Sequence, residues 1–428
     1  MVRISGKLKI PNSLAQDAKT AGVIEIHPAE LASFIQSSQQ ASSSCLVCSG
    51  GTSSRSAADG HLTIDLRTHF REFFYERSNK QVRIGGGIPM SELLAELLGH
   101  QRTFPTGLSG LPGLGYLLTG GISPLSRSLG LAIDQMIEID GIWGNGQHFR
   151  LQQPHANTAS EERLQWRGLC GAAPFLAVVT GLKIKTFPLK PLRIWRARLT
   201  PEQLPIAIQH AEGWPRSASF QWIWREQVLA YAVIDPADGE AEHCLQSLRN
   251  SLPDAVLIAE ETIAGLHDLP PFSAPEESKL PSARRHAEVL SLLSPAWKTA
   301  GKEMVQTLRE LLRARPDPLC CIASQQLGGM TSIPAPEATS FIHRGAQWKP
   351  WITASWPAGD LAEREKSLHW LKKVWSSMQP LCSGVHLAQL HPHLDWHQQT
   401  LKSAFGPWLT ELKVLKDQLD PQGLLPPL

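Results

Sequence analysis

Apolar and polar positions alternate in several short segments of the first hundred residues, and segments with helical spacing lie between them. The alternation predicts strands, because successive side chains of a strand point to opposite faces. These strands are residues 22–26, 45–49, 61–66 and 81–85. Residues 28–41 and 89–100 repeat apolar side chains at helical spacing, and each begins with proline, which favours the first helical turn. The first part of the chain is therefore predicted to mix strands and helices.

Residues 104–136 are rich in glycine but too apolar for a flexible linker. A buried, glycine-rich segment indicates that its backbone approaches another group closely. Residues 136–141 are a predicted strand that turns at Asp140-Gly141, with residues 148–152 as its hairpin partner. A long β-rich stretch, residues 174–189, closes this half.

After Pro191 the pattern predicts an antiparallel sheet with helices on one face. Residues 220–234 read as a hairpin that turns at 225–227. The other predicted strands are 254–262, 318–329 and 348–357, and the helices are 201–214, 240–251, part of 295–314, and 360–378. Residues 267–281 are a proline-rich loop. The final helix, 398–420, is interrupted at Gly406-Pro407.

The chain has 428 residues and a net charge of only +2, which gives no electrostatic reason to expect nucleic acid or a membrane as partner. No apolar run approaches the about 18 residues that span a bilayer, and no signal peptide is evident. Seven scattered cysteines fit a reducing compartment, so a cytoplasmic protein is expected. Cys45, Cys48 and Cys320-Cys321 are expected to be core thiols, and Arg284-Arg285-His286 a solvated loop.

The turn from Ser49 to Ser54 offers two glycines and several hydroxyls. Such a turn can bind phosphate with its backbone N–H groups, although taken alone it reads better as an ordinary loop. It is neither a Walker loop nor GxGxxG. The second glycine-rich segment changes this interpretation, because two such segments suggest the two walls of one dinucleotide site. Its glycines are Gly107, Gly110, Gly113, Gly115, Gly120 and Gly121.

These motifs, in this order, resemble the FAD-linked oxidases with a PCMH/vanillyl-alcohol-oxidase-type flavin domain, specifically the berberine-bridge-enzyme-like branch. The pyrophosphate loop of that family is matched by S-G-G-T-S at 49–53, and its long glycine wall by T-G-G-I-S-P-L-S-R-S-L-G-L-A-I-D at 119–134. Further matches are residues 82–98, 105–107, Asp140-Gly141, Trp166, Gly168, Gly171, 175–180, 327–344 and 404–425. The resemblance covers nearly the whole chain.

The resemblance implies an α+β fold with a two-subdomain FAD-binding domain over residues 1–192, an antiparallel cap domain over 193–385, and a tail, 386–428, that returns to the FAD domain. It also implies a set of FAD-binding residues. These are Ser49, Gly50, Gly51, Thr52, Ser53, Ser54, Thr106, Gly107, Ser109, Gly113, Gly115, Gly120, Gly121, Leu125 and Val179.

Several departures from the family pattern are informative. Thr52 stands where relatives carry a flavin-linking His, and Ser109 or Gly110 where they carry a flavin-linking Cys. Because these residues have no nitrogen or thiolate to attack a flavin, noncovalent FAD is expected. Phe405-Gly406-Pro407-Trp408 replaces a motif that gives a polar contact to the ring.

Substrate oxidation in this family needs a base near the flavin, and Tyr231, His386 and Tyr116 are the candidates. His386 is suited to work near neutral pH, but it is equally interpreted as a hydrogen-bonded strand histidine. Arg344 is read either as an anchor for a substrate anion or as half of a structural salt bridge. The histidines of residues 386–397 are read as a solvent-facing connection, so no metal is expected.

The function that the resemblance implies is FAD-dependent oxidation of a small alcohol, sugar or amine by hydride transfer to flavin N5. Oxygen or another acceptor would then take the electrons. Two alternatives stay open at this point: a non-catalytic or flavin-poor descendant of the same fold, and a relative of the 2-hydroxyacid dehydrogenases.

Overall fold

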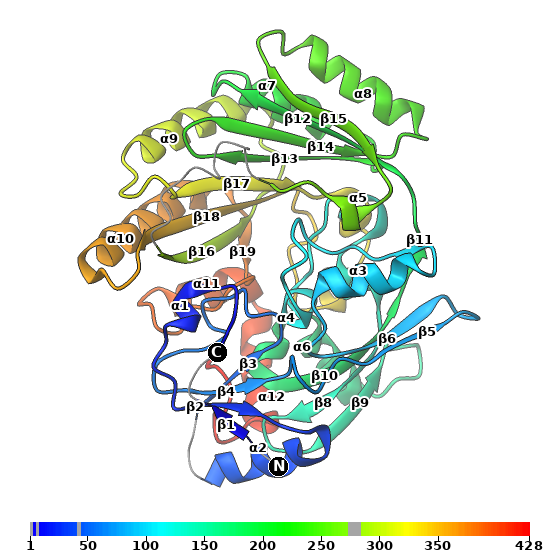
Figure 1. The fold of residues 1–428 in the computed structure, drawn as a ribbon, viewed down its shortest axis with the longest axis vertical. Helices are drawn as coiled ribbons and strands as arrows, with labels where there is room; N and C mark the ends of the chain where they lie inside the picture. The colour runs from blue at the N-terminus through cyan, green and yellow to red at the C-terminus, as the bar shows by residue number, and fades with distance from the viewer. Residues whose placement is uncertain (1–2, 6–7, 41–43, 273–283) are drawn as a thin grey trace.

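A computed structural model describes residues 3–5, 8–40, 44–272 and 284–428. Its two halves are stacked along the long axis, with both termini in the lower half (Figure 1). The lower half holds a four-stranded and a five-stranded sheet, and the upper half holds one eight-stranded sheet. The predicted α+β class is confirmed.

The four-stranded sheet has the order β1-β2-β4-β3. Its strands are β1 (Arg3–Ser5), β2 (Gly22–Glu25), β3 (Cys45–Cys48) and β4 (Leu62–Asp65). Helices α1 (Ser13–Gln16) and α2 (Pro28–Gln40) connect and cover it. Because β3 and β4 are parallel neighbours, the chain that joins them must leave the carboxyl end of β3 and cross back. Residues 49–61 form that connection.

The five-stranded sheet has the order β5-β6-β10-β8-β9, and all its pairs are antiparallel. Its strands are β5 (Phe73–Glu76), β6 (Gln81–Gly85), β8 (Met136–Trp143), β9 (His148–Gln152) and β10 (Ala177–Lys185); β7 (Arg102–Thr103) pairs with β11 (Phe187–Pro188). The helices of this part are α3 (Met90–Leu98), α4 (Leu114–Leu118), α5 (Ser126–Leu129) and α6 (Ser160–Leu176).

Two expectations for this sheet were wrong. Strand β8 runs straight through Asp140-Gly141, and the hairpin turns only after Trp143. Asp140 remains in the strand because its carboxylate pairs with Arg83 and Arg150. Gly141 fits the strand because the neighbouring backbone is close: a Cβ at this position would lie 2.6 Å from the Val178 carbonyl oxygen. The β-rich stretch predicted from residue 174 begins only at Ala177, because α6 reaches to Leu176.

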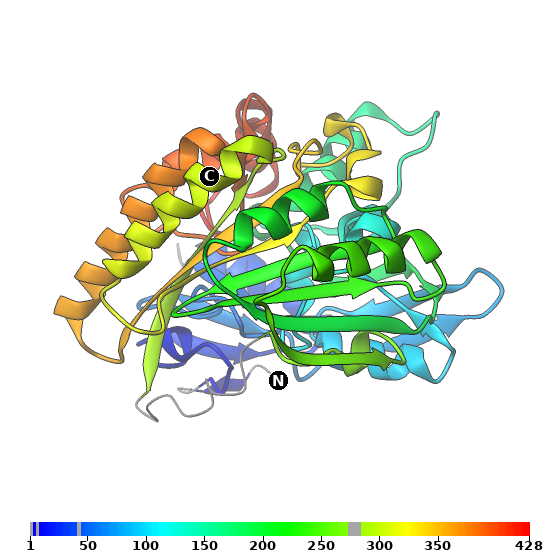
Figure 2. The ribbon, with the colours of Figure 1, turned by 90° about the horizontal axis from the view of Figure 1, so that it is seen from above.

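The eight-stranded sheet of the upper half is antiparallel, with the order β15-β12-β14-β13-β17-β18-β16-β19. In that order the strands are Val256–Ile263, Leu192–Leu199, Val228–Ile234, Ala218–Trp224, Cys321–Gln326, Trp348–Pro357, Arg285–Leu293 and Gly384–His386. Helices α7 (Leu204–Glu212), α8 (Gly239–Asn250), α9 (Gly301–Arg313) and α10 (Leu361–Met378) cover its upper face (Figure 2). The predicted sheet with helices on one face is confirmed.

The basic run at residues 284–286 was predicted to be a solvated loop, which holds for the exposed Arg284 but is wrong for Arg285 and His286. Arg285 begins β16, and His286 is buried. Two carboxylates stabilise these side chains inside the molecule: Asp317 pairs with Arg285, and Asp17 Oδ2 lies 2.8 Å from His286 Nε2.

The C-terminal segment crosses back to the lower half. Helices α11 (His397–Phe405) and α12 (Trp408–Leu419) are separated at Gly406, whose φ of +51° breaks the helix as predicted. Beyond them, the Leu424 carbonyl accepts a hydrogen bond of 2.7 Å from the Cys45 N–H, so the tail lies alongside β3. The connection 387–396 was expected to face solvent, but His391 is only 1% exposed.

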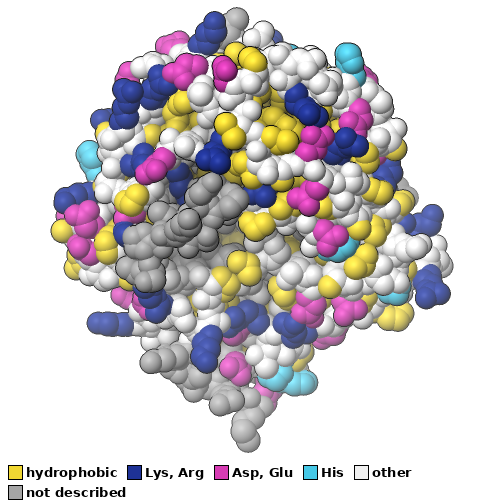
Figure 3. All heavy atoms as spheres, turned by 45° about the horizontal axis from the view of Figure 1, so that its top comes forward, with side chains coloured by type: hydrophobic (Ala, Val, Ile, Leu, Met, Phe, Trp, Pro, Cys, Tyr) yellow, Lys and Arg dark blue, Asp and Glu magenta, His cyan; other side chains and the backbone are white. Residues whose placement is uncertain are grey.

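The predicted core thiols are confirmed, because Cys45, Cys48, Cys320 and Cys321 are all buried. Burial raises the pKa of Cys45 and of Cys48 to about 12. No helix in the described part of the chain is long and apolar enough to cross a membrane. Basic and acidic side chains are intermixed over the face shown in Figure 3.

Candidate functional site

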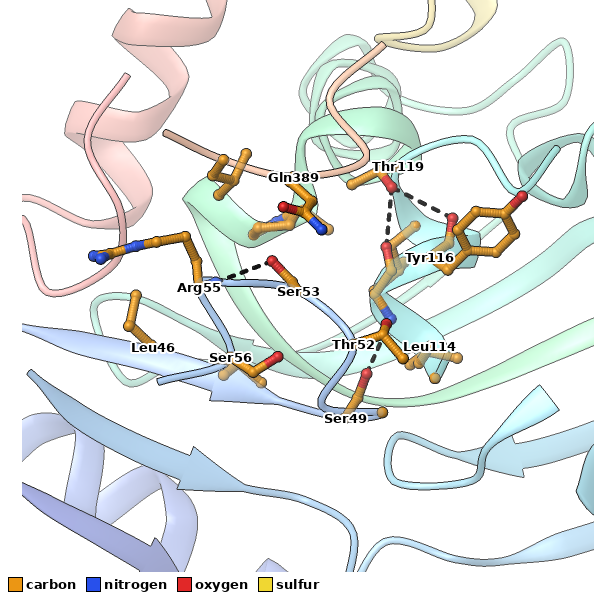
Figure 4. A pocket seen from close by; sticks show the side chains of 18 of the residues that line it. Leu46, Ser49, Thr52, Ser53, Arg55, Ser56, Leu114, Tyr116, Thr119 and Gln389 are labelled. Carbon is orange, nitrogen blue, oxygen red and sulfur yellow. Dashed lines mark hydrogen bonds between the residues drawn. The ribbon is translucent and has the colours of Figure 1, made fainter. Parts of the chain in front are cut away.

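A cavity opens between the loop that follows β3 and the start of α4, with residues 387–392 above it (Figure 4). It contains about 1030 Å³ of empty space, part of which is open to solvent. Both glycine-rich segments line it, as the sequence predicted. The lining residues are Leu46, Val47, Ser49–Ser53, Arg55, Ser56, Leu66, Gly113–Tyr116, Leu118, Thr119, Ala173, Pro174, Ala177, Val179, Leu387–Leu390, Pro392 and Pro426.

The two glycine-rich walls touch each other through their backbones. A Cβ built on Gly50 would lie 2.1 Å from the Gly113 nitrogen, and one on Gly113 would lie 2.6 Å from the Gly50 nitrogen. Ser49 Oγ accepts a hydrogen bond of 3.1 Å from the Gly115 N–H across the same contact. Glycine is therefore needed at both positions for the walls to meet.

The loop 49–54 presents backbone donors that no described protein group uses. The N–H groups of Gly50, Thr52 and Ser53 have no acceptor among the described residues. Asn12 holds the loop from behind, because its N–H donates to the Gly51 carbonyl at 2.9 Å and its Nδ2 to the Thr52 carbonyl at 3.2 Å. Gly51, at a φ of +71°, gives the loop the left-handed turn of an anion-binding nest.

The rest of the cavity is mostly apolar. Leu114, Leu118 and Leu387 contribute side chains at the α4 and tail sides, and Ala177 and Val179 of β10 lie at another wall. A cavity with backbone donors in one part and aliphatic walls in the others suits a ligand that combines phosphates with flat apolar rings.

Comparison with known proteins indicates which ligand this part of the chain binds. Residues 23–152, which contain both glycine-rich walls, match the family described as "FAD binding domain". The chain is an FAD-dependent oxidoreductase whose residues 23–152 carry a PCMH-type FAD-binding domain. One relative of this chain is the "Uncharacterized FAD-linked oxidoreductase YgaK" of Bacillus subtilis. It is 20% identical over 86% of this chain and 82% of its own length.

Solved structures of berberine-bridge-enzyme-like proteins and of related oxidases share this fold. The BBE-like 1 protein of Physcomitrella patens superposes with a TM-score of 0.83 at 16% identity, over 99% of this chain and 95% of its own. A chitooligosaccharide oxidase superposes with a TM-score of 0.82 at 18% identity, over 99% and 95%. As an FAD-linked oxidoreductase, the chain has residues that fit the cofactor: the free N–H donors of loop 49–54 suit a pyrophosphate, and the aliphatic walls suit its rings.

The structure divides the predicted FAD-binding residues into three groups. Those that line the cavity are Ser49, Gly50, Gly51, Thr52, Ser53, Gly113, Gly115 and Val179. Ser54 and Leu125 instead line two other cavities. The remaining residues, which line neither this cavity nor those two, are Thr106, Gly107, Ser109, Gly120 and Gly121.

The two positions that carry flavin bonds in relatives have different surroundings here. Thr52 lines the cavity, whereas Ser109 is exposed and accepts a hydrogen bond from the Leu111 N–H at 3.2 Å. None of the described residues that line the cavity is a His, Cys or Lys.

Each of the three candidate bases is hydrogen-bonded to a main-chain carbonyl. Tyr116 lines the cavity and donates its hydroxyl to the Ile122 carbonyl. Tyr231 on β14 donates to Pro270 at 3.1 Å and does not line the cavity. Burial is the main reason that the pKa of both phenols is raised.

His386 on β19 lies directly beside the second glycine-rich wall. Its Nε2 is 2.9 Å from the Thr119 carbonyl oxygen, which fixes Nε2 as the protonated nitrogen and leaves Nδ1 as an acceptor without a partner. Burial, and next the charge of Lys349, lower its pKa to about 3. The imidazole is therefore neutral at ordinary pH, and its role as base stays a prediction.

Sequence reasoning missed several residues of the cavity. Arg55 and Gln389 line it (Figure 4), and so does Pro426 near the C-terminus. Gln389 and Pro426 had no signal of their own, because only the return of the tail brings them here. Arg55 also lines a neighbouring cavity of about 2400 Å³ of empty space and so stands at the junction of the two.

One alternative left open by the sequence, the role of Arg344, is now decided. Arg344 forms a buried salt bridge with Asp134 at 2.8 Å and donates to Thr339 Oγ1 at 2.7 Å, so it is structural. The histidine-rich segment contributes His393, whose Nε2 is 2.9 Å from Glu288 Oε1. The described residues contain no group of three or more His, Cys, Asp or Glu arranged to hold a metal.

Proposed function

We propose that the chain holds FAD noncovalently in the cavity between the glycine-rich walls and oxidises a small organic molecule, an alcohol, sugar or amine. The observation that carries the proposal is the cavity itself, which has free backbone donors beside Gly50 and no His, Cys or Lys in its lining. When bound, FAD supplies the acceptor for the substrate's hydride, and oxygen or another acceptor then receives the electrons.

The chain's own residues have three tasks in this proposal. Loop 49–54 binds the pyrophosphate through N–H groups, and the closed contact between Gly50 and Gly113 keeps water out of that part of the cavity. The underside of the eight-stranded sheet covers the substrate. A proton must also leave the substrate, and His386 is the candidate whose ring nitrogen Nδ1 keeps a basic lone pair without a partner.

The visible spectrum of the purified protein, recorded before and after acid precipitation, tests this proposal. We expect flavin absorbance in the native protein and all of it in the supernatant after precipitation. Colour that stays in the pellet would show a covalent bond and contradict the noncovalent part. A colourless protein that takes up no added FAD would contradict the assignment of the cavity.

A further inference from the structure

The eight-stranded sheet carries an unusual row of polar side chains on the face opposite its helices. Gln221 of β13, Gln325 of β17 and Lys349 of β18 lie directly opposite one another in the strand register, so their side chains share one face. All three are more than nine-tenths buried. Such a row inside a protein needs partners, because buried polar groups without hydrogen bonds are costly.

The row faces the FAD-binding domain. Tyr231 extends it beyond Gln221 and packs in one cluster with Leu94 of α3 and Leu125 of the second glycine-rich wall. At the other end, His386 shares this face through Ser291 and Trp351, and its Nε2 reaches the Thr119 carbonyl. Thr119 in turn lines the FAD cavity. His386 therefore joins this face of the sheet to the lining of that cavity.

Several atoms on this face lack partners in the structure. Gln221 Oε1, Gln325 Nε2, Ser291 Oγ and His386 Nδ1 are buried without a hydrogen bond. Lys349 forms no hydrogen bond or ion pair with any described residue. The Lys349 ammonium lies over the Trp351 ring, 4.5 Å from the ring centroid. A buried ammonium without a counter-ion is rare, because a neighbouring carboxylate normally compensates for lost hydration.

We infer that Lys349 is a binding site for a carboxylate of the substrate, with the Gln325 amide as a second donor. The inference rests on the proposed function, since it places the substrate under the sheet. The ammonium and the amide N–H are both donors, and an ionised carboxylate is purely an acceptor. The aromatic rings of Trp351, beside Lys349, and of Phe341, beside His386, suit a flat or apolar body for the rest of the molecule.

Benzoate and its neutral isostere benzamide are suitable probes, with two readouts. The first is the thermal unfolding midpoint, which a ligand raises by mass action whether or not flavin is present. The second is the visible spectrum of bound FAD, which reports a ligand near the ring. For the wild type at pH 6, we expect benzoate to raise the midpoint and to perturb the spectrum saturably, and benzamide to do neither.

Lys349→Met removes the charge at similar volume and should weaken benzoate binding about tenfold or more, as expected for loss of a charge-assisted hydrogen bond. Lys373→Met, on the exposed side of α10, is the matched control and should bind as the wild type does. If Lys349→Met does not fold, Lys349→Gln takes its place, and the comparison of benzoate with benzamide on the wild type is independent of both.

Equal binding of benzoate and benzamide, or unchanged benzoate binding by Lys349→Met, would overturn the inference. A thermal shift without a spectral change in the flavin-loaded protein would place the anion away from the cofactor and would also overturn it. If no flavin binds at all, the proposed function fails, whereas a benzoate shift that depends on Lys349 still supports the anion site.

Discussion

Because Gly50 and Gly113 touch through their backbones, a single added methyl group should push the two walls of the cavity apart. In Gly50→Ala the new Cβ would lie 2.1 Å from the Gly113 nitrogen, so one wall must move away from the other. We expect the variant to fold but to lose at least about 1.4 kcal/mol of FAD affinity, a tenfold change. Gly239→Ala is the control, because a Cβ there meets nothing within 4 Å. Titration of both variants with FAD measures the effect, and equal affinities would contradict it.

Lys349 has a second measurable property, its effect on stability. Burial lowers its pKa from 10.5 to about 7, so the unfolded chain binds the proton more tightly than the folded protein. The free energy of unfolding of the wild type should therefore rise as pH increases from 7 to 10.5. Below pH 7 the destabilisation caused by the buried Lys349 ammonium should have its full size. Lys349→Met should be more stable than the wild type at pH 6 to 7, and should lack this pH-dependent gain. Urea unfolding at several pH values would show whether it does.

At the scale of the element, the Arg127 side chain ties α5 to β13 of the eight-stranded sheet and to two segments beside it. Arg127 donates to the carbonyls of Ala218 at 2.8 Å, Leu327 at 2.6 Å and Trp214 at 2.7 Å. Because Arg127→Met would leave three carbonyls unsatisfied, we expect the free energy of unfolding to fall by about 3 kcal/mol or more. Arg313→Met, at an exposed position of α9, should change it by less than about 0.5 kcal/mol. A urea midpoint of Arg127→Met within error of the wild type would contradict this account.

The periodicity of the sequence predicted most elements, but it failed where a local signal opposed tertiary structure. Asp140-Gly141 looks like a turn, yet Arg150 on the neighbouring strand β9 and Arg83 on β6 hold Asp140 in the sheet. Helix α6 was missed because it bends at Gly171, whose φ is +126°, and contains Pro174. The glycine-rich walls of the site were predicted from their order along the chain. Arg55, Gln389 and the row ending at Lys349 were not, because register and the return of the tail bring them together.

At the scale of the whole molecule, Glu288 joins three parts of the chain. Its carboxylate, on β16, accepts a hydrogen bond of 2.8 Å from Ser54 Oγ of loop 49–54 and lies 2.9 Å from His393 Nε2 of the tail. Burial alone would raise its pKa, but its interactions with His391, at 3.6 Å, and with His393 outweigh burial and lower the pKa to about 2. The stabilisation is therefore present above pH 4.5 and is lost as pH falls towards 2.

Glu288→Gln should lower stability at pH 7 and flatten the acid side of the stability profile. It should also weaken FAD binding, because Ser54 no longer has a carboxylate to hold its loop. Glu303→Gln on the exposed side of α9 provides the comparison. Parallel pH profiles for Glu288→Gln and the wild type between pH 4.5 and 2 would exclude this role for the carboxylate.

The path of the tail also bears on the order of events during synthesis. Loop 49–54 leaves the ribosome early, but Leu387, Gln389 and Pro426 complete the cavity that it lines. The cavity is therefore incomplete until residue 426 has been translated, and a nascent chain stalled after residue 380 should emerge with both glycine-rich segments yet retain no flavin. Flavin loading should thus report that the tail, residues 386–428, has been translated, a property that a site built only from the first 192 residues would lack.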